Sequence, residues 1–373
     1  MTTSGSKTTH DLAIIGPVPP PYGGVSIHIK RLMGHLDRAG IDYLVYNNSR
    51  EGTPSERVRP VGRRGRRWLV GYLLRGPEPV VYVHTSRWDV WRATWWLSRV
   101  RGKAVILSVH TDSLRRLWPV RSWLARRAVV GAFRAARTVV AVSTHVRDFL
   151  EEVAGVGHKT VVIPDFVEPI RRPEDEGAVD PTVRAFCETH EPVLLGNGAP
   201  IVYDDGRDLY GIDQTIELVD RLRAIWPGIG VVWYLLKFTG WNPAYAEQMA
   251  GEVQRRGLDS HWLFAEPTGE MYPTFPHVDV FVRPTCSDGD AVSIRESLHF
   301  GVPTVTSDAA PRPAGTVVFK TRDQDDYVAK VRATLESLDD ARAEAAAAPS
   351  VSAVAAEVDM LRQIIDEVHG GRD

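Results

Sequence analysis

The sequence predicts an α/β protein of two domains, each built on a parallel sheet. Short apolar runs alternate along most of the chain with segments that carry apolar residues at helical spacing, which is typical of parallel sheets covered by helices. The length of 373 residues suffices for two domains. Residues 1–165 contain 26 Lys and Arg against 12 Asp and Glu, and residues 166–373 contain 19 against 35, so the charge divides the chain in the same way.

In the first half, apolar runs predict a series of strands. They are Leu12–Ile15, Tyr43–Tyr46, Val80–His84, Ala104–His110 and Thr138–Val142. A loop rich in Pro and Gly, residues 16–24, joins the first strand to a helix expected over Val25–Asp37. A strand, Gly-rich loop and helix in this order can hold a phosphate, although such a loop is as often only a turn. The G-x-G-x-x-G pattern is absent, so a dinucleotide is not indicated.

In the second half, the same alternation follows a predicted linker. Residues 167–191 are acidic, contain proline and lack a periodic pattern. The expected strands are Val193–Gly196, Gly230–Leu236 and Trp262–Phe264, and the expected helices are Tyr210–Ile225, residues 324–347 and Ala353–Val368. The predicted division is an N-terminal domain, 1–166; a linker, 167–191; a C-terminal domain, 192–348; and a final helical segment, 349–373.

The stretch 279–308 has the order strand, loop, helix, strand. A polar loop, residues 285–290, follows the strand at its carboxyl end and leads directly into the N-terminus of a helix, where backbone N–H groups suit a phosphate. Asp288 precedes the helix and Glu296 lies inside it, seven residues further on. This spacing lets both carboxylates border one pocket and bind sugar hydroxyls, although two isolated carboxylates more often only cap a helix.

This stretch resembles the donor-sugar motif of the GT-B glycosyltransferases of the retaining family 4. Their pattern is an acidic residue, seven further residues, Glu, a small residue and then a Gly-x-Pro strand; Asp288, Glu296, Ser297, Gly301 and Pro303 match it, with Asp in place of the usual first Glu.

Two places in the first half also resemble this family. Gly23 and Gly24 are similar to its N-terminal diglycine loop, and His110 is similar to the strand-end histidine that faces the donor sugar. For His84, which also ends a strand, we expect a structural role.

The resemblance implies two Rossmann-like domains facing each other across a cleft, with the last helix returning to the first domain. It also implies a retaining, hexosyltransferase-type enzyme that uses a nucleotide-diphosphate sugar and needs neither metal nor cofactor. Glu296 would hold the ribose hydroxyls, Asp288 the donor sugar, and His110 would lie beside the reacting sugar. The diphosphate would meet the helix amides near Ala291, Val292 and Ser293.

One departure from the family concerns the cations that bind the donor diphosphate. Family members place Arg and Lys just after the first strand of the second domain, where this chain has Asn197 and its neighbours, and Tyr210 replaces the usual Lys before Gly211. The nearby cations that could substitute are Arg207 and Lys237, although each is more often a surface residue.

Three alternatives stay open. Asp288 and Asp290 could form an Asp-x-Asp metal site, a weak signal on its own. A nucleotide-sugar 2-epimerase can share the architecture and would need no acceptor. The missing Arg and Lys pair also fits a non-catalytic pseudo-glycosyltransferase.

The acceptor prediction comes from Arg and Trp residues that interleave in the basic half. The cationic and aromatic residues concerned are Arg63, Arg64, Arg66, Arg67, Trp68, Arg87, Trp88, Trp91, Arg92, Trp95, Trp96, Arg99, Arg115, Arg116, Trp118, Arg121, Trp123, Arg126 and Arg127. Such a surface suits anionic lipid, which favours a saccharide or lipid-linked saccharide acceptor. Buried Trp beside surface Arg explains the pattern equally well, and a soluble natural-product acceptor is the alternative. Nucleic acid is not expected, because no binding motif accompanies the patch.

Cysteine content and hydropathy indicate the compartment. Cys187 and Cys286 lie far apart in sequence and form no disulfide or zinc pattern. The first ten residues are polar, and no apolar run has the length of a membrane span. We therefore expect a cytoplasmic protein that can also bind the inner membrane face.

Overall fold

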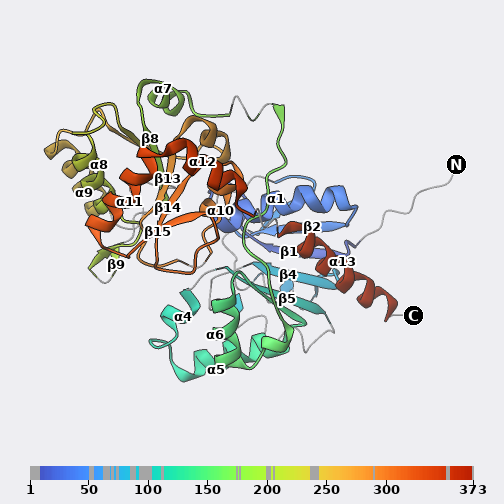
Figure 1. The fold of residues 1–373 in the computed structure, drawn as a ribbon. Helices are drawn as coiled ribbons and strands as arrows, with labels where there is room; N and C mark the ends of the chain where they lie inside the picture. Colours follow the sequence, from blue (N-terminus) through green and yellow to red (C-terminus); the bar gives the residue numbers. More distant parts are fainter. Residues whose placement is uncertain are drawn as a thin grey trace. The chain divides into compact units, whose positions relative to one another are not determined.

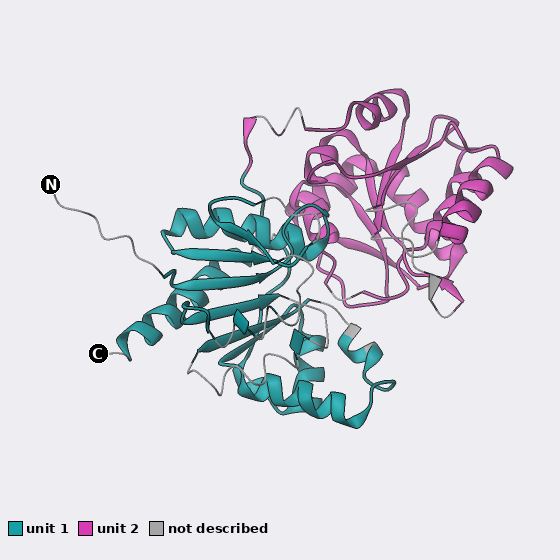
Figure 2. Ribbon diagram, turned by 180° about the vertical axis from the view of Figure 1, so that it is seen from behind, with its two compact units in different colours: residues 1–170, 352–373 teal, residues 171–351 magenta. Residues whose placement is uncertain are grey.

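The computed structural model describes residues 9–49, 54–61, 68, 71–72, 75–84, 90–91, 103–110, 113–173, 175, 178–198, 203–204, 206–235, 243–288, 290–349 and 353–371. The chain divides into two compact units: residues 1–170 with 352–373, and residues 171–351 (Figure 2). We call them unit 1 and unit 2. Each contains one large, wholly parallel sheet, so the predicted α/β class with two Rossmann-like domains is confirmed.

Unit 1 is organised on a seven-stranded sheet with the order β3-β2-β1-β4-β5-β6-β7 (Figure 1). The strands are β1 Leu12–Gly16, β2 Tyr43–Asn47, β3 Val58–Pro60, β4 Val80–His84, β5 Ala104–Val109, β6 Thr138–Ala141 and β7 Thr160–Val162. Because neighbouring strands are parallel, their carboxyl ends meet at one edge of the sheet.

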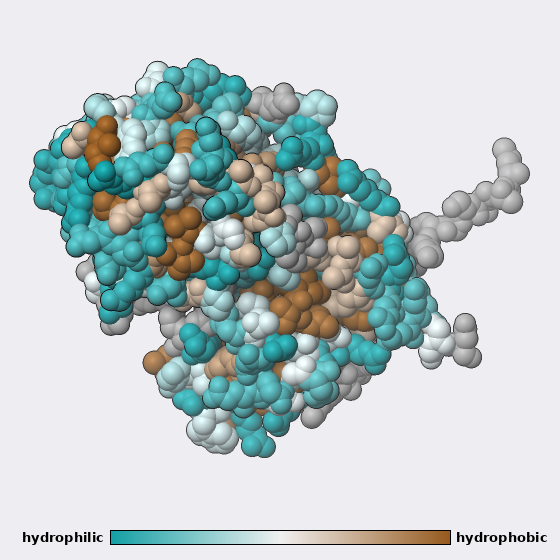
Figure 3. Space-filling model, viewed as in Figure 1, coloured by the Kyte–Doolittle hydropathy of each residue, from teal (hydrophilic) through white to brown (hydrophobic). Residues whose placement is uncertain are grey.

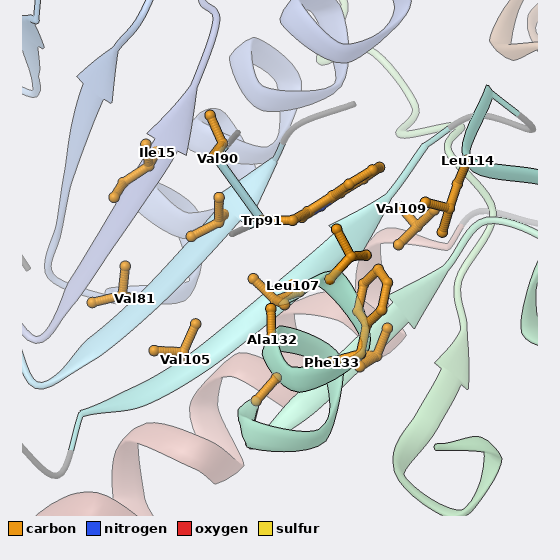
Figure 4. Packing of buried hydrophobic residues seen from close by; sticks show 14 of the residues in the cluster. Ile15, Val81, Val90, Trp91, Val105, Leu107, Val109, Leu114, Ala132 and Phe133 are labelled. Atoms are coloured by element: carbon orange, nitrogen blue, oxygen red, sulfur yellow. The ribbon is translucent and has the colours of Figure 1, made fainter. Parts of the chain in front are cut away.

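Helices cover both faces of this sheet. They are α1 Gly24–Ala39, α4 Ser113–Leu117, α5 Trp123–Ala135, α6 Thr144–Ala154 and α13 Val354–Gly370, with a 3₁₀ turn at Gly157–Lys159. Side chains alternate along β1: Leu12 and Ile14 pack with α1 and α13, whereas Ala13 and Ile15 belong to the cluster that α5 and α6 complete. Figure 4 shows Ala132 and Phe133 of α5 close to Leu107 in that second cluster. The predicted return of the last helix to the first domain is confirmed, since α13 belongs to unit 1 and packs against α1.

Unit 2 has a six-stranded sheet with the order β12-β11-β8-β13-β14-β15. The strands are β8 Val193–Gly198, β11 Gly230–Leu235, β12 Trp262–Ala265, β13 Val280–Arg283, β14 Thr304–Ser307 and β15 Thr316–Phe319. A small antiparallel pair, β9 Tyr203–Asp204 and β10 Arg207–Asp208, follows β8. The helices are α7 Pro181–Thr189, α8 Ile212–Leu222, α9 Pro243–Arg255, α10 Val292–His299, α11 Gln324–Glu336 and α12 Leu338–Ala347, with a 3₁₀ helix, η4, at Tyr272–His277. One sheet face packs with α8, α9 and α11, and the other with α7, α10 and η4.

The structure differs from the expected elements in two places that bear on the site. The expected linker, residues 167–191, is not one element: Val167 is buried in unit 1, and α7 belongs to unit 2. The helix expected over Tyr210–Ile225 is α8, Ile212–Leu222, because the buried carboxylate of Asp208 accepts hydrogen bonds from the amides of Tyr210, Gly211 and Ile212 ahead of it. Among the described residues, no helix is long and apolar enough to cross a membrane.

Candidate functional site

The candidate residues lie where the strand order of each sheet changes direction. In unit 1 this point is between β1 and β4, and in unit 2 it is between β8 and β13. Ligands of open parallel sheets bind at such a point, outside the carboxyl ends of the strands. In unit 1, His84 ends β4. In unit 2, Asn197 and Arg283 lie at the ends of β8 and β13. Each unit therefore has polar residues at the point where its strand order changes direction.

Arg283 joins the two central strands of unit 2. Its Nη1 donates to the carbonyl oxygen of Asn197 and to the Asn197 side-chain oxygen, both at 3.0 Å. Its Nε donates to Oδ2 of Asp288 at 3.3 Å, and its guanidinium lies 5.2 Å from the ring centre of Tyr210. Asn197, which the sequence offered as a donor-binding residue, is therefore the hydrogen-bond partner of Arg283, and its role in donor binding stays a prediction.

A second arginine completes this cluster. Arg312 follows β14 and donates from Nη1 to the same Oδ2 of Asp288 at 3.1 Å, while its Nε donates to the carbonyl oxygen of Ser307 at 2.7 Å. Burial alone would raise the pKa of Asp288, but Arg283 and Arg312 outweigh it and lower that pKa below its ordinary value. Asp288 is therefore ionised at neutral pH, and two guanidinium groups surround one carboxylate.

The helix that follows has the predicted position. α10 begins at Val292 with Ala291 as its N-cap residue, so the amides of Val292 and Ser293 lie in its first turn, which has no intrahelical acceptors for them. Glu296 lies inside α10 and is buried, with 4% of its surface exposed. Nε of Arg295 donates to both carboxylate oxygens of Asp290, each at 2.8 Å.

Neither of the two cations expected to replace the family's Arg and Lys pair is seen at the arginine cluster. Arg207 is exposed in the small β9–β10 hairpin, and Lys237 lies outside the described residues. Instead, Arg283 and Arg312 reach the site. Sequence reasoning missed them because Arg283 reads as the end of a strand and Arg312 lies 24 residues beyond Asp288; the parallel pairing of β13 with β14 brings them together.

The loop ahead of α8 fixes this edge of the sheet. Gly211 has a φ of 73°, and a Cβ there would lie 2.3 Å from the carbonyl oxygen of Pro284, directly after β13. Asp208 occupies the N-terminus of α8 and also accepts from the Tyr245 hydroxyl at 3.0 Å. An anionic ligand is therefore better received by the N-terminus of α10 than by that of α8.

In unit 1, the histidine predicted to face a sugar is buried in a polar network. His110, 4% exposed, is hydrogen-bonded through Nδ1 to Oδ1 of Asp165 and through Nε2 to Nδ1 of His84 at 2.9 Å. Burial, together with His110 and His28, lowers the pKa of His84 well below its ordinary value. A neutral His84 can donate from Nδ1 to Nε2 of His110, and His110 can then donate from Nδ1 to Asp165. The hydrogen bonds therefore run in one direction, from His84 through His110 to Asp165.

A buried ion pair adjoins this network. His28 of α1 contacts the carbonyl oxygen of Asp165 through Nδ1 at 2.9 Å and Oε1 of Glu357 in α13 through Nε2 at 3.1 Å. The Tyr82 hydroxyl donates to the same Glu357 oxygen at 2.7 Å. Burial alone would lower the pKa of His28, but Glu357 and Asp165 raise it to about 9. His28 is therefore a cation at neutral pH, and no sequence signal linked it to residues 137 and 329 positions away.

The predicted diglycine forms the start of α1. Gly23 is its N-cap residue, and Gly24 is its first residue. The amide of Gly23 donates to the Ser26 hydroxyl at 2.9 Å, which supports the turn from within the chain. A phosphate role for this loop stays a prediction.

A cavity of about 590 Å³ lies at the other end of α10. Its lining includes Phe300, the C-cap residue of α10, together with Tyr272 and His277 of η4. It therefore does not include Asp288, Glu296 or the arginine cluster.

Solved structures that share this fold are GT-B glycosyltransferases. The Anabaena protein HepE, solved with UDP and glucose, superposes with a TM-score of 0.68 at 14% identity over 97% of this chain and 100% of its own. Sucrose-phosphate synthase from Thermosynechococcus elongatus gives 0.71 at 16% identity over 95% and 99%. WaaG, a glycosyltransferase involved in lipopolysaccharide biosynthesis, gives 0.67 at 15% identity over 94% and 99%. The chain thus has the GT-B fold.

Residues 22–171 match the sequence family described as Glycosyltransferase Family 4. The family recognised from the sequence is thereby confirmed for the N-terminal unit, whereas the Asp288–Glu296 motif lies outside the matched residues. No curated protein matches the chain.

Proposed function

We propose that this chain is a glycosyltransferase that takes a sugar from a nucleotide-diphosphate donor, without a metal ion and with retention of configuration. The observation that carries the proposal is the Arg283–Asp288–Arg312 cluster at the strand-order change of unit 2, directly ahead of the N-terminus of α10. The Glycosyltransferase Family 4 match supports it, as do HepE structures that contain UDP or UDP-glucose.

Each polar group of this cluster has a role in the proposal. Arg283 exposes 11% of its side chain and Arg312 4%, so Arg283 is assigned to the donor diphosphate and Arg312 to holding Asp288. The amides of Val292 and Ser293 share the negative charge that develops on the leaving diphosphate. Asp288, oriented by both arginines, binds the sugar hydroxyls, and Glu296 binds the ribose.

Metal independence rests on the partners of the Asp-x-Asp carboxylates. Asp288 pairs with two arginines and Asp290 with Arg295, so each carboxylate already has cationic neighbours. A divalent cation would have to bind against this positive charge, which disfavours a metal site. The arginines and helix amides then supply the charge stabilisation that a metal ion provides elsewhere.

The proposed acceptor is a saccharide or lipid-linked saccharide, and the proposed location is the cytoplasm, including the inner membrane face. Support comes from the basic composition of the first half and from the fold shared with WaaG, which is involved in lipopolysaccharide biosynthesis. Hexosyl transfer and the part of His110 beside the sugar also belong to the proposal.

Donor binding tests the assignment of Arg283. Calorimetric titration with UDP-, GDP-, ADP- and dTDP-sugars should identify one donor. Arg283→Gln should then weaken its affinity roughly 10- to 100-fold, since a charged hydrogen bond contributes about 1.5–3 kcal/mol. Arg283→Lys, which keeps the charge but not the fork that grips Asn197, should be intermediate.

Arg332→Gln is the matched control, because Arg332 forms an exposed pair with Glu336 on α11 of the same unit. Equal donor affinity in Arg283→Gln and Arg332→Gln, both folded by circular dichroism, would remove Arg283 from the site.

A further inference from the structure

An apolar turn stands exposed on unit 1. Val120 is 76% exposed, Trp123 67% and Leu124 62%. Other exposed large hydrophobic residues of the described chain, such as Val161 and Ile225, occur singly and expose 38% and 45%. Figure 3 shows a mostly hydrophilic face with separate hydrophobic patches, so three such residues within five positions are unusual for this surface.

Hydrogen bonds from the side chain of a nearby arginine, Arg126, to backbone carbonyl groups stabilise the turn. Arg126 of α5 donates through Nη2 to the carbonyl oxygen of Pro119 at 2.8 Å and through Nε to that of Arg121 at 2.9 Å. The Ser122 hydroxyl caps the first turn of α5 by accepting from the Ala125 amide. Val120 lies in the turn just before the N-cap of α5, and Trp123 and Leu124 are the first two residues of that helix, so the three exposed side chains lie close together along the chain.

The surroundings of the turn are strongly basic. Residues 113–127, which include the turn, contain five arginines and no Asp or Glu. Arg115, Arg121 and Arg127 are exposed close in sequence to the apolar residues. A partner that covers this surface must therefore supply negative charge around an apolar centre.

We infer that Val120, Trp123 and Leu124 insert into the headgroup region of an anionic lipid bilayer, with Arg115, Arg121 and Arg127 on the lipid phosphates. A bilayer interface offers anionic groups above an apolar layer, and tryptophan prefers the depth where the two meet. A nucleic acid backbone would satisfy the arginines but leave Val120 and Leu124 against phosphate. The inference rests on exposure and charge alone and does not depend on glycosyl transfer.

Vesicle binding tests this surface. The wild-type protein should float with phosphatidylcholine vesicles that contain phosphatidylglycerol, bind pure phosphatidylcholine vesicles far less, and dissociate as salt rises. The triple variant Val120→Ser, Trp123→Ser, Leu124→Ser should bind at least tenfold more weakly. Arg121→Gln with Arg127→Gln should weaken binding about 30-fold, from about 1 kcal/mol for each cation near the surface.

Two controls separate insertion from misfolding. Ile225→Ser, on the other unit, should bind like the wild type, and all variants should keep the wild-type melting temperature because the changed residues are exposed. Brominated lipids should quench part of the tryptophan fluorescence, and Trp123→Phe should bind nearly as well but lose that quenching.

The proposal is wrong if the wild type stays unbound with anionic vesicles at low salt. It is equally wrong if the triple variant binds as tightly as the wild type. Donor binding at Arg283 is measured without vesicles, so its failure is separate from either result.

Discussion

Replacing Glu357 should greatly reduce a pH dependence that is built into unit 1. In the folded protein, the pKa of His28 is raised from 6.5 to about 9. A raised pKa stabilises the fold fully below the unfolded value of 6.5, and that contribution is lost as the pH rises through about 9. Each pKa unit corresponds to about 1.4 kcal/mol, so the ceiling of the effect is about 3 kcal/mol.

His84 changes stability in the opposite sense at lower pH. Its folded pKa lies well below 6.5, so the unfolded chain binds more protons there, and stability rises with pH up to about 6.5. The two histidines together place the maximum stability of this network near pH 6.5. Only the loss between pH 6.5 and 9 belongs to the pair of His28 and Glu357.

Hydrogen exchange in α13 measures this loss directly, because α13 carries Glu357 and packs on α1. After correction for intrinsic exchange, protection of Val354–Gly370 in the wild type should fall by up to about 100-fold from pH 6.5 to pH 9. In Glu357→Gln the slope should be much smaller, since only Asp165 then opposes the effect of burial on the pKa of His28. Glu336→Gln, at an exposed pair on α11, should retain the wild-type slope. Identical slopes in the wild type and Glu357→Gln would refute the ion pair.

Three further predictions concern unit 2. Glu296→Ala should weaken donor binding by about 1–3 kcal/mol through loss of a ribose hydrogen bond, and unchanged affinity in titration calorimetry would remove that role. Gly211→Ala should lower the melting temperature, because its φ of 73° and a Cβ 2.3 Å from the Pro284 carbonyl oxygen strain the loop; a melting temperature equal to that of the wild type would show that the loop relaxes. Transfer activity should survive excess EDTA, whereas full loss restored by Mg²⁺ or Mn²⁺ would return Asp288 and Asp290 to a metal role.

The central strands were predictable because parallel strands are buried on both faces. β1, β4 and β8 read as continuous apolar runs and lie within two residues of their expected ends. β15 and α9 were not predicted, although both carry apolar residues: β15 contains two valines and a phenylalanine, and α9 buries Tyr245, Ala246, Met249 and Val253. The start of α8 was misplaced because a buried aspartate, Asp208, caps it from outside the helical pattern.

The candidate site was predictable only where its residues are close in sequence. Asp288, Ala291 and Glu296 share one loop and helix, so their order along the chain determines where they lie. Arg312 meets Asp288 only because β14 lies beside β13. His28 meets Glu357 across 329 positions, through packing of α13 on α1. Contacts of this kind depend on strand order and helix docking, and no local pattern encodes them.

Acceptor-dependent release of nucleoside diphosphate tests the central claim most directly. The protein, in EDTA, is incubated with the donor that it binds, with and without lipid-linked saccharide, and the products are separated by chromatography. We predict nucleoside diphosphate and a glycosylated acceptor in equal amounts, both strongly reduced in Arg283→Gln and unaffected in Arg332→Gln. Conversion of the donor to an isomer without acceptor, or donor binding with no turnover on any acceptor, would contradict a glycosyltransferase.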